Sequence, residues 1–358
     1  MNDATSSEAK MTIGLDLGDR HIQMCVLSAD GEVIEESRLV CRPAALHARF
    51  LAASPTRVVI EAGTHSPWVS RLLAEIGHEV IVANPRKLRL IYENDSKSDR
   101  VDAEYLARVG RLDPALLSPL AHREASTQAD LAVIRSRDAL VKMRAGLVNH
   151  VRGSVKAAGG RISKCSTDTF PKTAADKLPA ELAPALAPVL DTIAHLTEQI
   201  RAYDRQIERL CEEKYPETKA LVQLKGVGEL TALAYVLTIE DPARFPKARS
   251  VGSYLGLRPR QAQSGAADPQ LRITKAGDDM LRRLLVGSAH YILGPFGPDT
   301  DLRRWGLSIA AGGSKAAKKR AVVAVARKLS VLLLRLWVTG EVYEPLRNAA
   351  RDGEMVSA

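Results

Sequence analysis

Four carboxylates stand where predicted elements begin or end in the N-terminal third of the chain. Asp16 ends the first predicted strand, Glu61 ends the strand RVVIE, and Asp99 and Asp102 flank the start of a helix. Asp99 and Asp102 share one helical face if both lie in or beside its first turn. Four carboxylates at one sheet edge repel unless cations hold them, and Mg²⁺ prefers such oxygen ligands. Two ions about 3.5–4 Å apart suit phosphodiester chemistry, so we predict a magnesium-dependent site.

A second motif, LVQLKGVGELTALAYVL at residues 221–237, carries a glycine turn between two predicted helices. The first helix ends before Gly226 and Gly228, and the second begins at Thr231. The pattern resembles a helix-hairpin-helix, in which backbone N–H groups approach a phosphate without reading the base sequence. We therefore predict that Lys225, Gly226 and Gly228 contact nucleic acid. A purely structural corner between two helices is the alternative.

A third motif, residues 254–285, places cations on both sides of a Gly/Ser loop. Between Pro242 and Ser288, Lys and Arg outnumber Asp and Glu by nine to three, which predicts a nucleic-acid surface. The candidate contacts are Arg258, Arg260, Arg272 and Lys275. Ser264 occupies the loop tip beside Gly265. A serine there favours a turn, and no His–Asp pair that would activate it is recognisable.

The elements that position these residues predict an α/β plus α architecture. Three hairpin strands followed by alternating helices and strands predict an RNase H-like domain over residues 11–125. Apolar residues at helical spacing predict a helical hairpin of coiled-coil type over 126–214. The region 215–347 is predicted to be a mainly helical C-terminal domain. We expect a disordered N-terminus at 1–10 and a flexible tail at 348–358.

Within the first domain the apolar patterns set the expected bounds of each element. The predicted strands are 11–17, 21–27, 33–40, 57–61 and 79–83, and the predicted helices are 43–53, 67–76 and 101–111.

The composition is that of a basic globular protein. The 358 residues contain 51 Lys and Arg against 42 Asp and Glu, a net charge of +9, which favours a polyanionic partner, nucleic acid before membrane. Aromatic residues make up 4%, too few for a base-stacking platform. The four cysteines have no zinc or disulfide pattern, as in a reduced cytoplasmic protein. No signal peptide is expected, and three cations interrupt the apolar stretch 321–338, so no membrane span is expected either.

The opening IGLDLG is also found in sugar kinases and Hsp70-like ATPases, where the Asp and Gly lie beside nucleotide phosphates. Those proteins need a second Asp–Gly phosphate loop and a Gly-rich adenosine loop, and the sequence contains neither. It also lacks a GxxxxGK[ST] phosphate-binding loop. An ATP-dependent activity is therefore disfavoured.

Together these motifs resemble the bacterial DEDD insertion-sequence transposases (the "IS one-ten" family), whose members include bridge-RNA-guided recombinases. At the front the resemblance rests on IGLDLG with Asp16, VVIEAG with Glu61, VANPRKLR, and KSDRVDAEYLA with Asp99 and Asp102. Further along it rests on LKGVGELTALAYVLTIEDPARF, SYLGLRPRQAQSG and RITKAGDDMLRRLL.

The resemblance implies a RuvC-like N-terminal domain, a helical coiled-coil insertion and a C-terminal transposase domain. It implies that the four carboxylates form a metal-binding tetrad and that Ser264, in the loop reading QSG, attacks a DNA phosphate and stays attached to the strand. It further implies an active site shared between protomers of a tetramer, and a structured RNA that pairs with target and donor DNA. Family members often carry Thr and Asn where this chain has Ser98 and Asp278, and Asp278 puts an acid where phosphate binding is expected.

We therefore predict an RNA-guided transposase that joins DNA through a serine nucleophile, uses two Mg²⁺ ions with Mn²⁺ as a substitute, and needs no ATP. Its expected partners are donor and target DNA, a guide RNA and further copies of itself as a dimer or tetramer. We expect it in the bacterial cytoplasm, at the nucleoid. One alternative is a RuvC-like, structure-selective endonuclease that uses metal-activated water; another is a non-catalytic nucleic-acid-binding protein.

Overall fold

The computed structural model describes residues 11–88, 98–265, 269 and 271–348. These residues belong to two compact units, Met1–Glu124 and Ala125–Ala358, which are described separately below. The predicted disordered N-terminus lies outside the described residues, as does the predicted tail beyond its first residue. The predicted separation of a helical hairpin from a C-terminal domain, within the second unit, stays a prediction.

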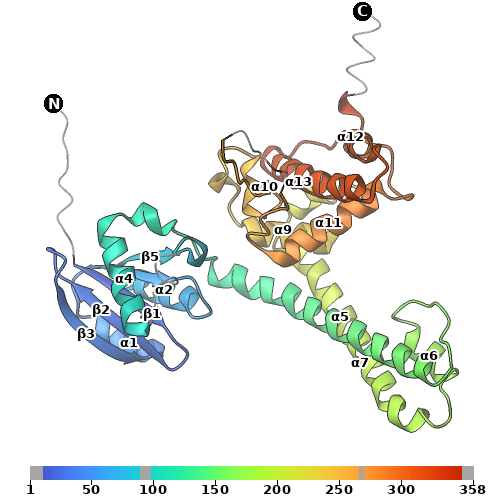
Figure 1. The fold of residues 1–358 in the computed structure, drawn as a ribbon, viewed down its shortest axis with the longest axis horizontal. Helices are drawn as coiled ribbons and strands as arrows, with labels where there is room; N and C mark the ends of the chain where they lie inside the picture. The colour runs from blue at the N-terminus through green and yellow to red at the C-terminus, as the bar shows by residue number, and fades with distance from the viewer. Residues whose placement is uncertain (1–10, 89–97, 266–268, 270, 349–358) are drawn as a thin grey trace, which may run out of the picture. The chain divides into compact units, whose positions relative to one another are not determined.

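The first unit is built on a five-stranded mixed sheet (Figure 1). In chain order its strands are β1 (Thr12–Leu17), β2 (His21–Leu27), β3 (Val33–Val40), β4 (Arg57–Glu61) and β5 (Glu79–Ala83). The spatial order is β3-β2-β1-β4-β5, with the first three strands antiparallel and β4 and β5 parallel to β1. All five predicted strands are confirmed, the first beginning one residue later than predicted. This order is consistent with an RNase H-like sheet.

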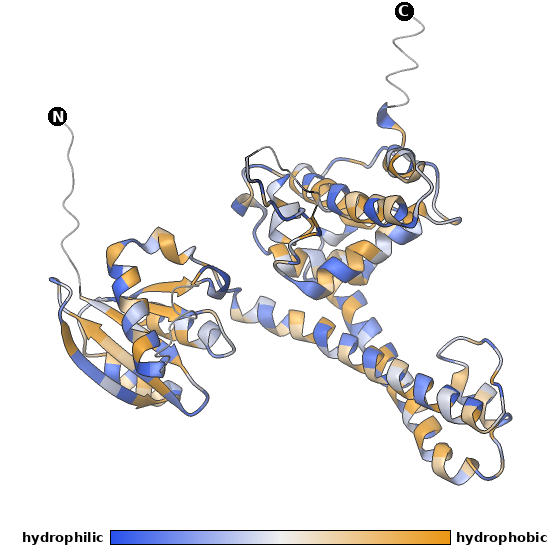
Figure 2. Cartoon of the chain, viewed as in Figure 1, coloured by the Kyte–Doolittle hydropathy of each residue, from blue (hydrophilic) through white to orange (hydrophobic). Residues whose placement is uncertain are grey.

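Helices cover both faces of this sheet. Alternation along β1 sends Ile13 and Leu15 to one face, where they join a cluster with residues of α1 (Pro43–Phe50) and α2 (Ser66–Glu75). On the other face, α4 (Asp99–Leu112) packs its alanines against β2. In Figure 2 the central strands are correspondingly hydrophobic. Two short 3₁₀ turns, η1 (Pro85–Lys87) and η2 (Pro114–Leu117), follow β5 and α4.

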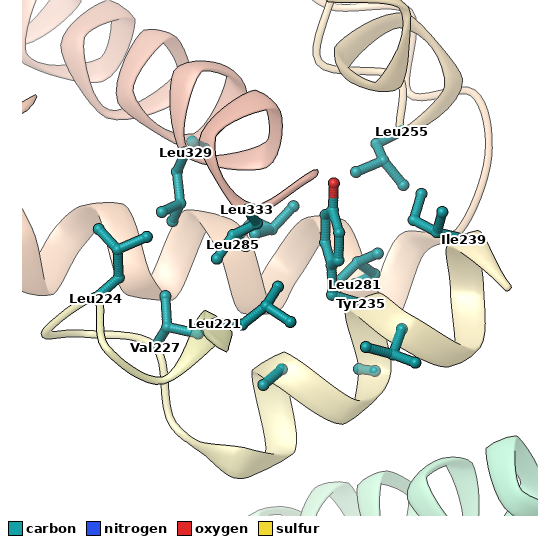
Figure 3. Packing of buried hydrophobic residues seen from close by; sticks show 14 of the residues in the cluster. Leu221, Leu224, Val227, Tyr235, Ile239, Leu255, Leu281, Leu285, Leu329 and Leu333 are labelled. Carbon is teal, nitrogen blue, oxygen red and sulfur yellow. The ribbon is translucent and has the colours of Figure 1, made fainter. Parts of the chain in front are cut away.

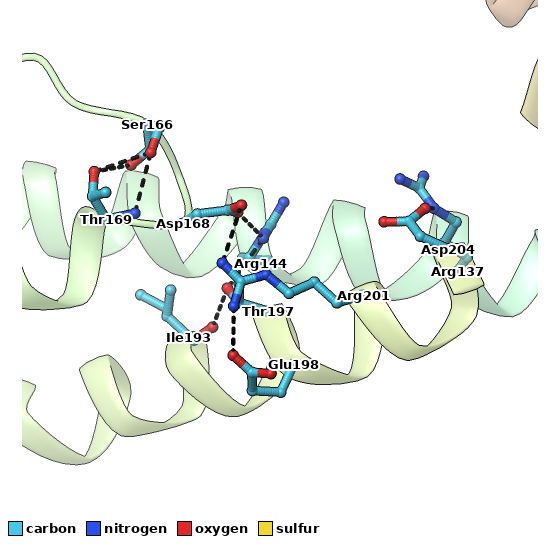
Figure 4. Close-up of polar contacts among 10 residues, drawn as sticks. All are labelled: Arg137, Arg144, Ser166, Asp168, Thr169, Ile193, Thr197, Glu198, Arg201 and Asp204. Carbon is cyan, nitrogen blue, oxygen red and sulfur yellow. Dashed lines mark hydrogen bonds and ion pairs between the residues drawn. The ribbon is translucent and has the colours of Figure 1, made fainter. Parts of the chain in front are cut away.

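The second unit begins with two long helices that lie side by side, α5 (Ala125–Ala157) and α7 (Ala183–Glu213), with the short α6 (Phe170–Ala175) between them (Figure 1). Polar side chains join the pair along its length (Figure 4). Arg144 donates to Asp168 Oδ1 at 2.8 Å and to Thr197 Oγ1 at 3.1 Å, and Arg137 pairs with Asp204. These contacts fix how the two helices align along each other.

The remaining helices surround one apolar core. They are α8 (Thr218–Leu221), α9 (Glu229–Ile239), α10 (Ser250–Tyr254), α11 (Asp279–Leu293), α12 (Asp301–Ala310) and α13 (Lys315–Thr339), with the 3₁₀ turn η3 (Pro242–Arg244) after α9. Every residue of α9 from Thr231 to Ile239 is buried, which marks it as the central helix. Figure 3 shows Tyr235 among leucines of this core; its hydroxyl donates to Ser330 O at 2.6 Å, and burial raises its pKa.

All four cysteines are free thiols. Burial raises the pKa of Cys25 and of Cys211 to about 11. Among the residues that the structure describes, no helix combines the length and the apolar character needed to cross a bilayer.

Candidate active site and nucleic-acid interface

The parallel pairing of β1 and β4 brings two of the four predicted carboxylates to adjacent strand ends. Leu15 lies opposite Ile60 in this pairing, and the next residues along the two strands are Asp16 and Glu61. Both carboxylates are half-buried. The carboxyl ends of neighbouring parallel strands open on the same edge of a sheet, so these two side chains share that edge.

The helix α4 runs across β1 and β4 toward the opposite edge. A Cβ built on Gly14 would lie 2.0 Å from the carbonyl oxygen of Ala103, and one built on Gly110 would lie 2.3 Å from the side chain of Val59. Near the start of β4, Arg57 donates to the carbonyl of Gly110 at 3.1 Å. The C-terminal end of α4 therefore lies over the amino ends of the strands, and its first turn lies toward their carboxyl ends.

That first turn carries the other two predicted carboxylates. Ser98 caps the helix by accepting a hydrogen bond from the Val101 amide at 3.4 Å. Asp99 is exposed and Asp102 is half-buried. The helix N-terminus stabilises negative charge at both positions. The backbone thus carries Asp99, Asp102 and the two strand-end carboxylates to one edge of the sheet.

The four side chains are oxygen donors only, which fits a hard divalent cation rather than zinc. Over residues 11–88, 98–265, 269 and 271–348, no three His, Cys, Asp or Glu side chains gather closely enough to hold one ion as they stand. A cation shared by these carboxylates would require their side chains to turn toward one another.

The loop after β4 is held by residues that the sequence patterns did not single out. The buried Ser66 hydroxyl donates to Gly63 O at 2.8 Å, accepts from Gly63 N at 2.9 Å, and lies 2.8 Å from Nε2 of His122. Burial, together with the charges of Arg71 and Arg123, lowers the pKa of His122. This contact ties the loop that follows Glu61 to the segment after α4. Only the three-dimensional contact reveals it, because the two residues are 56 positions apart.

Ser264 belongs to the second unit, on a hairpin formed by residues on either side of its loop. The hairpin is defined by a bridge between Pro259 and Ile273 and by a hydrogen bond from Arg260 N to Arg272 O at 2.9 Å. Ser264 is exposed. Among described residues, no side chain hydrogen-bonds to its hydroxyl.

The base of this hairpin is fastened by a buried arginine. Arg282 is 7% exposed and donates to Leu255 O at 3.1 Å, to Ala276 O at 2.8 Å and to Asp279 at 2.9 Å. The neighbouring Asp278, noted above as a departure from the family, caps α11 by accepting from the Leu281 amide at 2.8 Å. It also pairs with Arg135 of α5 at 3.2 Å. Its acid group therefore has structural partners.

The predicted helix-hairpin-helix residues lie at an exposed corner of the helical core. Gly226 has φ +100°, and a Cβ there would lie 2.8 Å from the ring of Tyr291, so this position needs glycine. The second helix begins at Glu229 rather than at Thr231, because Gly228 is its extended N-cap. Glu229 puts an acid in the first turn, which weakens the attraction of that turn for a phosphate.

The structure separates the predicted cationic residues into three groups. Lys225 lies near one end of α12, in a pocket that also includes Thr300. Arg272 and Lys275 line a groove that contains Ile309 from the other end of α12. Arg258 and Arg260 alternate along their strand with the groove-lining residues and are not among them; Arg258 hydrogen-bonds to Gln261.

Two family models match the chain, one over the acidic residues of the first unit and one over part of the second unit. Residues 13–158 match a DEDD transposase model, and residues 218–298 match the model described as "Transposase IS116/IS110/IS902 family". Together the matches span more than half of the chain. The chain belongs to this transposase family. It is therefore an enzyme of DNA strand cleavage and transfer. DEDD transposases normally use divalent metal ions.

Relatives along almost the whole length agree with this assignment. A putative transposase (y4pF/y4sB) of Sinorhizobium fredii is 28% identical over 97% of this chain and 89% of its own length. The transposase for insertion sequence element IS1111A of Coxiella burnetii is 27% identical, over 92% and 90% respectively. The pilin gene-inverting protein of Moraxella bovis is 26% identical, over 79% and 80%.

Proposed function

We propose that this transposase breaks and rejoins DNA through Ser264, with Mg²⁺ held by Asp16, Glu61, Asp99 and Asp102. The observation that carries the proposal is the meeting of the first turn of α4 with the ends of β1 and β4 at one sheet edge. Support for the serine comes from its exposed position on a hairpin bordered by cations. The RNase H-like assignment of the first unit, and its RuvC-like character, belong to the same proposal.

In the proposed reaction the Ser264 oxygen attacks a DNA phosphorus. A Ser–O–P bond forms while the bond from phosphorus to one deoxyribose oxygen breaks. The serine proton leaves, and the released deoxyribose oxygen gains one. A hydroxyl of the second DNA end then attacks the same phosphorus and frees the serine. One phosphodiester is exchanged for another, so no ATP is required.

The acidic residues supply what Ser264 lacks, because a serine hydroxyl is a weak nucleophile at neutral pH. Bound Mg²⁺ would lower the pKa of that oxygen and neutralise charge on the phosphate. The role of the chain is to hold two strand ends and one helix turn in fixed register, so that the four carboxylates lie at one edge of the sheet. The four carboxylates belong to the first unit and Ser264 to the second. This division is compatible with an active site in which one protomer of a dimer or tetramer supplies the carboxylates and another supplies Ser264.

The proposal includes nucleic-acid contacts by Lys225, Gly226, Gly228 and the hairpin cations Arg258, Arg260, Arg272 and Lys275. It also includes a guide RNA that pairs with donor and target DNA, in which case the protein reads backbone shape more than base edges. Both nucleic acids suit a chain with a net charge of +9. The proposed place of action is the nucleoid, in the cytoplasm.

One observation favours a second candidate, a RuvC-like endonuclease that uses metal-activated water. Gly265, next to Ser264, has φ +55°, as in a tight turn, so Ser264 there would be a turn residue.

An assay for covalent protein–DNA complexes separates the two candidates. Ser253, in α10 of the same motif, is the other candidate nucleophile in the sequence. Wild type, Ser264→Ala, Ser253→Ala and Asp102→Ala are incubated with DNA and RNA from the flanks of the element, with Mg²⁺ or with chelator, and run on a denaturing gel. The proposal predicts an adduct with wild type and Ser253→Ala, lost in Ser264→Ala, in Asp102→Ala and with chelator. Cleaved DNA without adduct, unchanged in Ser264→Ala, would establish the water-using endonuclease instead.

A further inference from the structure

A groove of about 1100 Å³ runs between the Ser264 hairpin and α13. Its apolar wall includes Leu257 and Ile273 from the hairpin side and Val323 and Ala324 from α13. Five cationic side chains share this groove, which we call the α13 groove: Arg272, Lys275, Lys319, Arg320 and Arg327. None of its lining residues is acidic.

Several arginines elsewhere in this unit form ion pairs with acids. Arg304 pairs with Asp299 at 2.6 Å and Arg335 pairs with Glu341 at 2.8 Å. Within the described part of the chain, no ion pair involves Arg272, Lys319 or Arg327. All three are exposed. Several like charges along one groove repel one another, and a polyanion relieves that repulsion.

The backbone of Lys275 gives a second, independent observation. Its φ of +54° lies in the left-handed region that favours glycine or asparagine. The amide of Lys275 donates to Gly256 O at 3.1 Å, which holds it in this conformation. A non-glycine residue is strained in this conformation, and such strain concentrates at ligand-binding positions. Lys275 has this strained backbone, and its side chain lines the groove. We take this as support for a role of its ammonium group in binding an anion.

The helix contributes its cations from one face. Lys319, Val323 and Arg327 follow each other at intervals of four residues, so they line one stripe of α13. Successive helical residues are rotated by about 100°, so the adjacent Lys318 faces away from this stripe, and it does not line the groove. The helix therefore provides a matched pair of exposed lysines, one in the groove and one outside it.

The groove is within reach of the proposed nucleophile. Pro259 lines it, and Ser264 follows five residues later on the same hairpin. At about 3.4 Å per extended residue the separation is at most ~17 Å. DNA rises 3.4 Å per nucleotide along one strand, so this corresponds to about five nucleotides.

We propose that the α13 groove holds the backbone of the DNA strand that Ser264 attacks, with Lys319, Arg320 and Arg327 on its phosphates. This inference rests on the proposed function. The inference adds α13 to the proposed DNA-binding surface and states that α13 contacts the DNA strand that is cut.

The test measures how binding depends on salt, using full-length protein that carries Ser264→Ala so that no cutting occurs. A fluorescein-labelled DNA duplex of mixed sequence is titrated at several salt concentrations, and RNA of the same sequence is titrated in parallel. Each lost duplex phosphate contact lowers the slope of log affinity against log salt by about 0.9. We expect Lys319→Gln to lower it by about that amount, and the Lys319→Gln/Arg320→Gln/Arg327→Gln variant by about 2.7. Lys318→Gln should leave it unchanged.

Equal losses in Lys318→Gln and Lys319→Gln would mean diffuse attraction to the whole helix, and would overturn the proposal. No change in Lys319→Gln, or a change with RNA alone, would overturn the assignment to DNA. Circular dichroism checks that the variants fold. The titrations measure DNA binding by a protein that cannot cut, whereas the adduct assay measures the reaction of Ser264. A negative result for the groove is therefore distinguishable from a negative result for the serine mechanism.

Discussion

A single methyl group added at Gly14 would displace α4, the helix that carries Asp99 and Asp102. A Cβ at this position would lie 2.0 Å from Ala103 O and 2.6 Å from Ala107 N, which are backbone atoms of α4. Real Cβ atoms essentially never lie closer than 3.0 Å to such an atom. In Gly14→Ala, α4 must therefore move away from β1 by about 1 Å, or the strand must move instead.

The expected loss of stability is about 1–3 kcal/mol, the usual cost of overpacking. The expected loss of activity is roughly 100-fold, because a displacement of about 1 Å at a catalytic group reduces rates by about that factor. Hydrogen–deuterium exchange of α4 peptides measures the loosening, and the adduct assay measures the activity. We expect faster exchange in α4 and an adduct yield reduced by about two orders of magnitude.

Gly63→Ala is the matched control, since no atom lies within 4 Å of a Cβ at that position, although it is also near the site. It should retain the exchange rates and the activity of the wild type. Unchanged α4 exchange and full activity in Gly14→Ala would refute the close packing of α4 on β1, and with it the reason for placing the carboxylates of α4 beside those of the strands.

Three further predictions follow from buried groups. Arg282→Met leaves two backbone carbonyls without their donor, so we expect the free energy of unfolding in urea to fall by about 2–4 kcal/mol; a loss under 1 kcal/mol would contradict it. The pKa of folded His122 is lowered, so its contribution to stability is complete above about pH 6.5 and is lost as the pH falls through the folded pKa. His122→Asn should therefore flatten the acid loss of stability between about pH 7 and pH 5, and an unchanged slope would count against it. Cys25, with a pKa of about 11, should react with iodoacetamide at about pH 8 roughly 100-fold more slowly than an ordinary thiol; equal labelling of native and unfolded protein would oppose this.

The positions of the acidic residues in the chain could be predicted because their signals are local. Alternating apolar residues define β1 and β4 within a few positions, so Asp16 and Glu61 were correctly assigned to strand ends. The helix carrying Asp99 and Asp102 begins two residues earlier than predicted, because the side chain of Ser98 caps it. The sequence could not show which way α4 crosses the sheet, since that depends on close approaches at glycines far apart in the chain.

The cationic groove could not be predicted because its two walls come from distant segments. Arg272 and Lys319 share it only because α10, α11 and α13 pack around the buried α9. The helix α9 begins at Glu229, two residues before the predicted start at Thr231, because Gly228 O accepts hydrogen bonds from the amides of Thr231 and Ala232. Composition indicated a polyanionic partner but carried no information on which cations cluster.

Mass spectrometry of the trapped protein–DNA adduct tests the central claim most directly. After nuclease and trypsin digestion, the peptide 261–272 (QAQSGAADPQLR) contains a single hydroxyl side chain, that of Ser264. We predict that this peptide carries the nucleotide remnant, with Mg²⁺ present and Asp102 intact. A remnant on the peptide 250–260 (SVGSYLGLRPR), which contains Ser253, or no modified peptide while cleaved DNA accumulates, would contradict the assignment of Ser264 as the nucleophile.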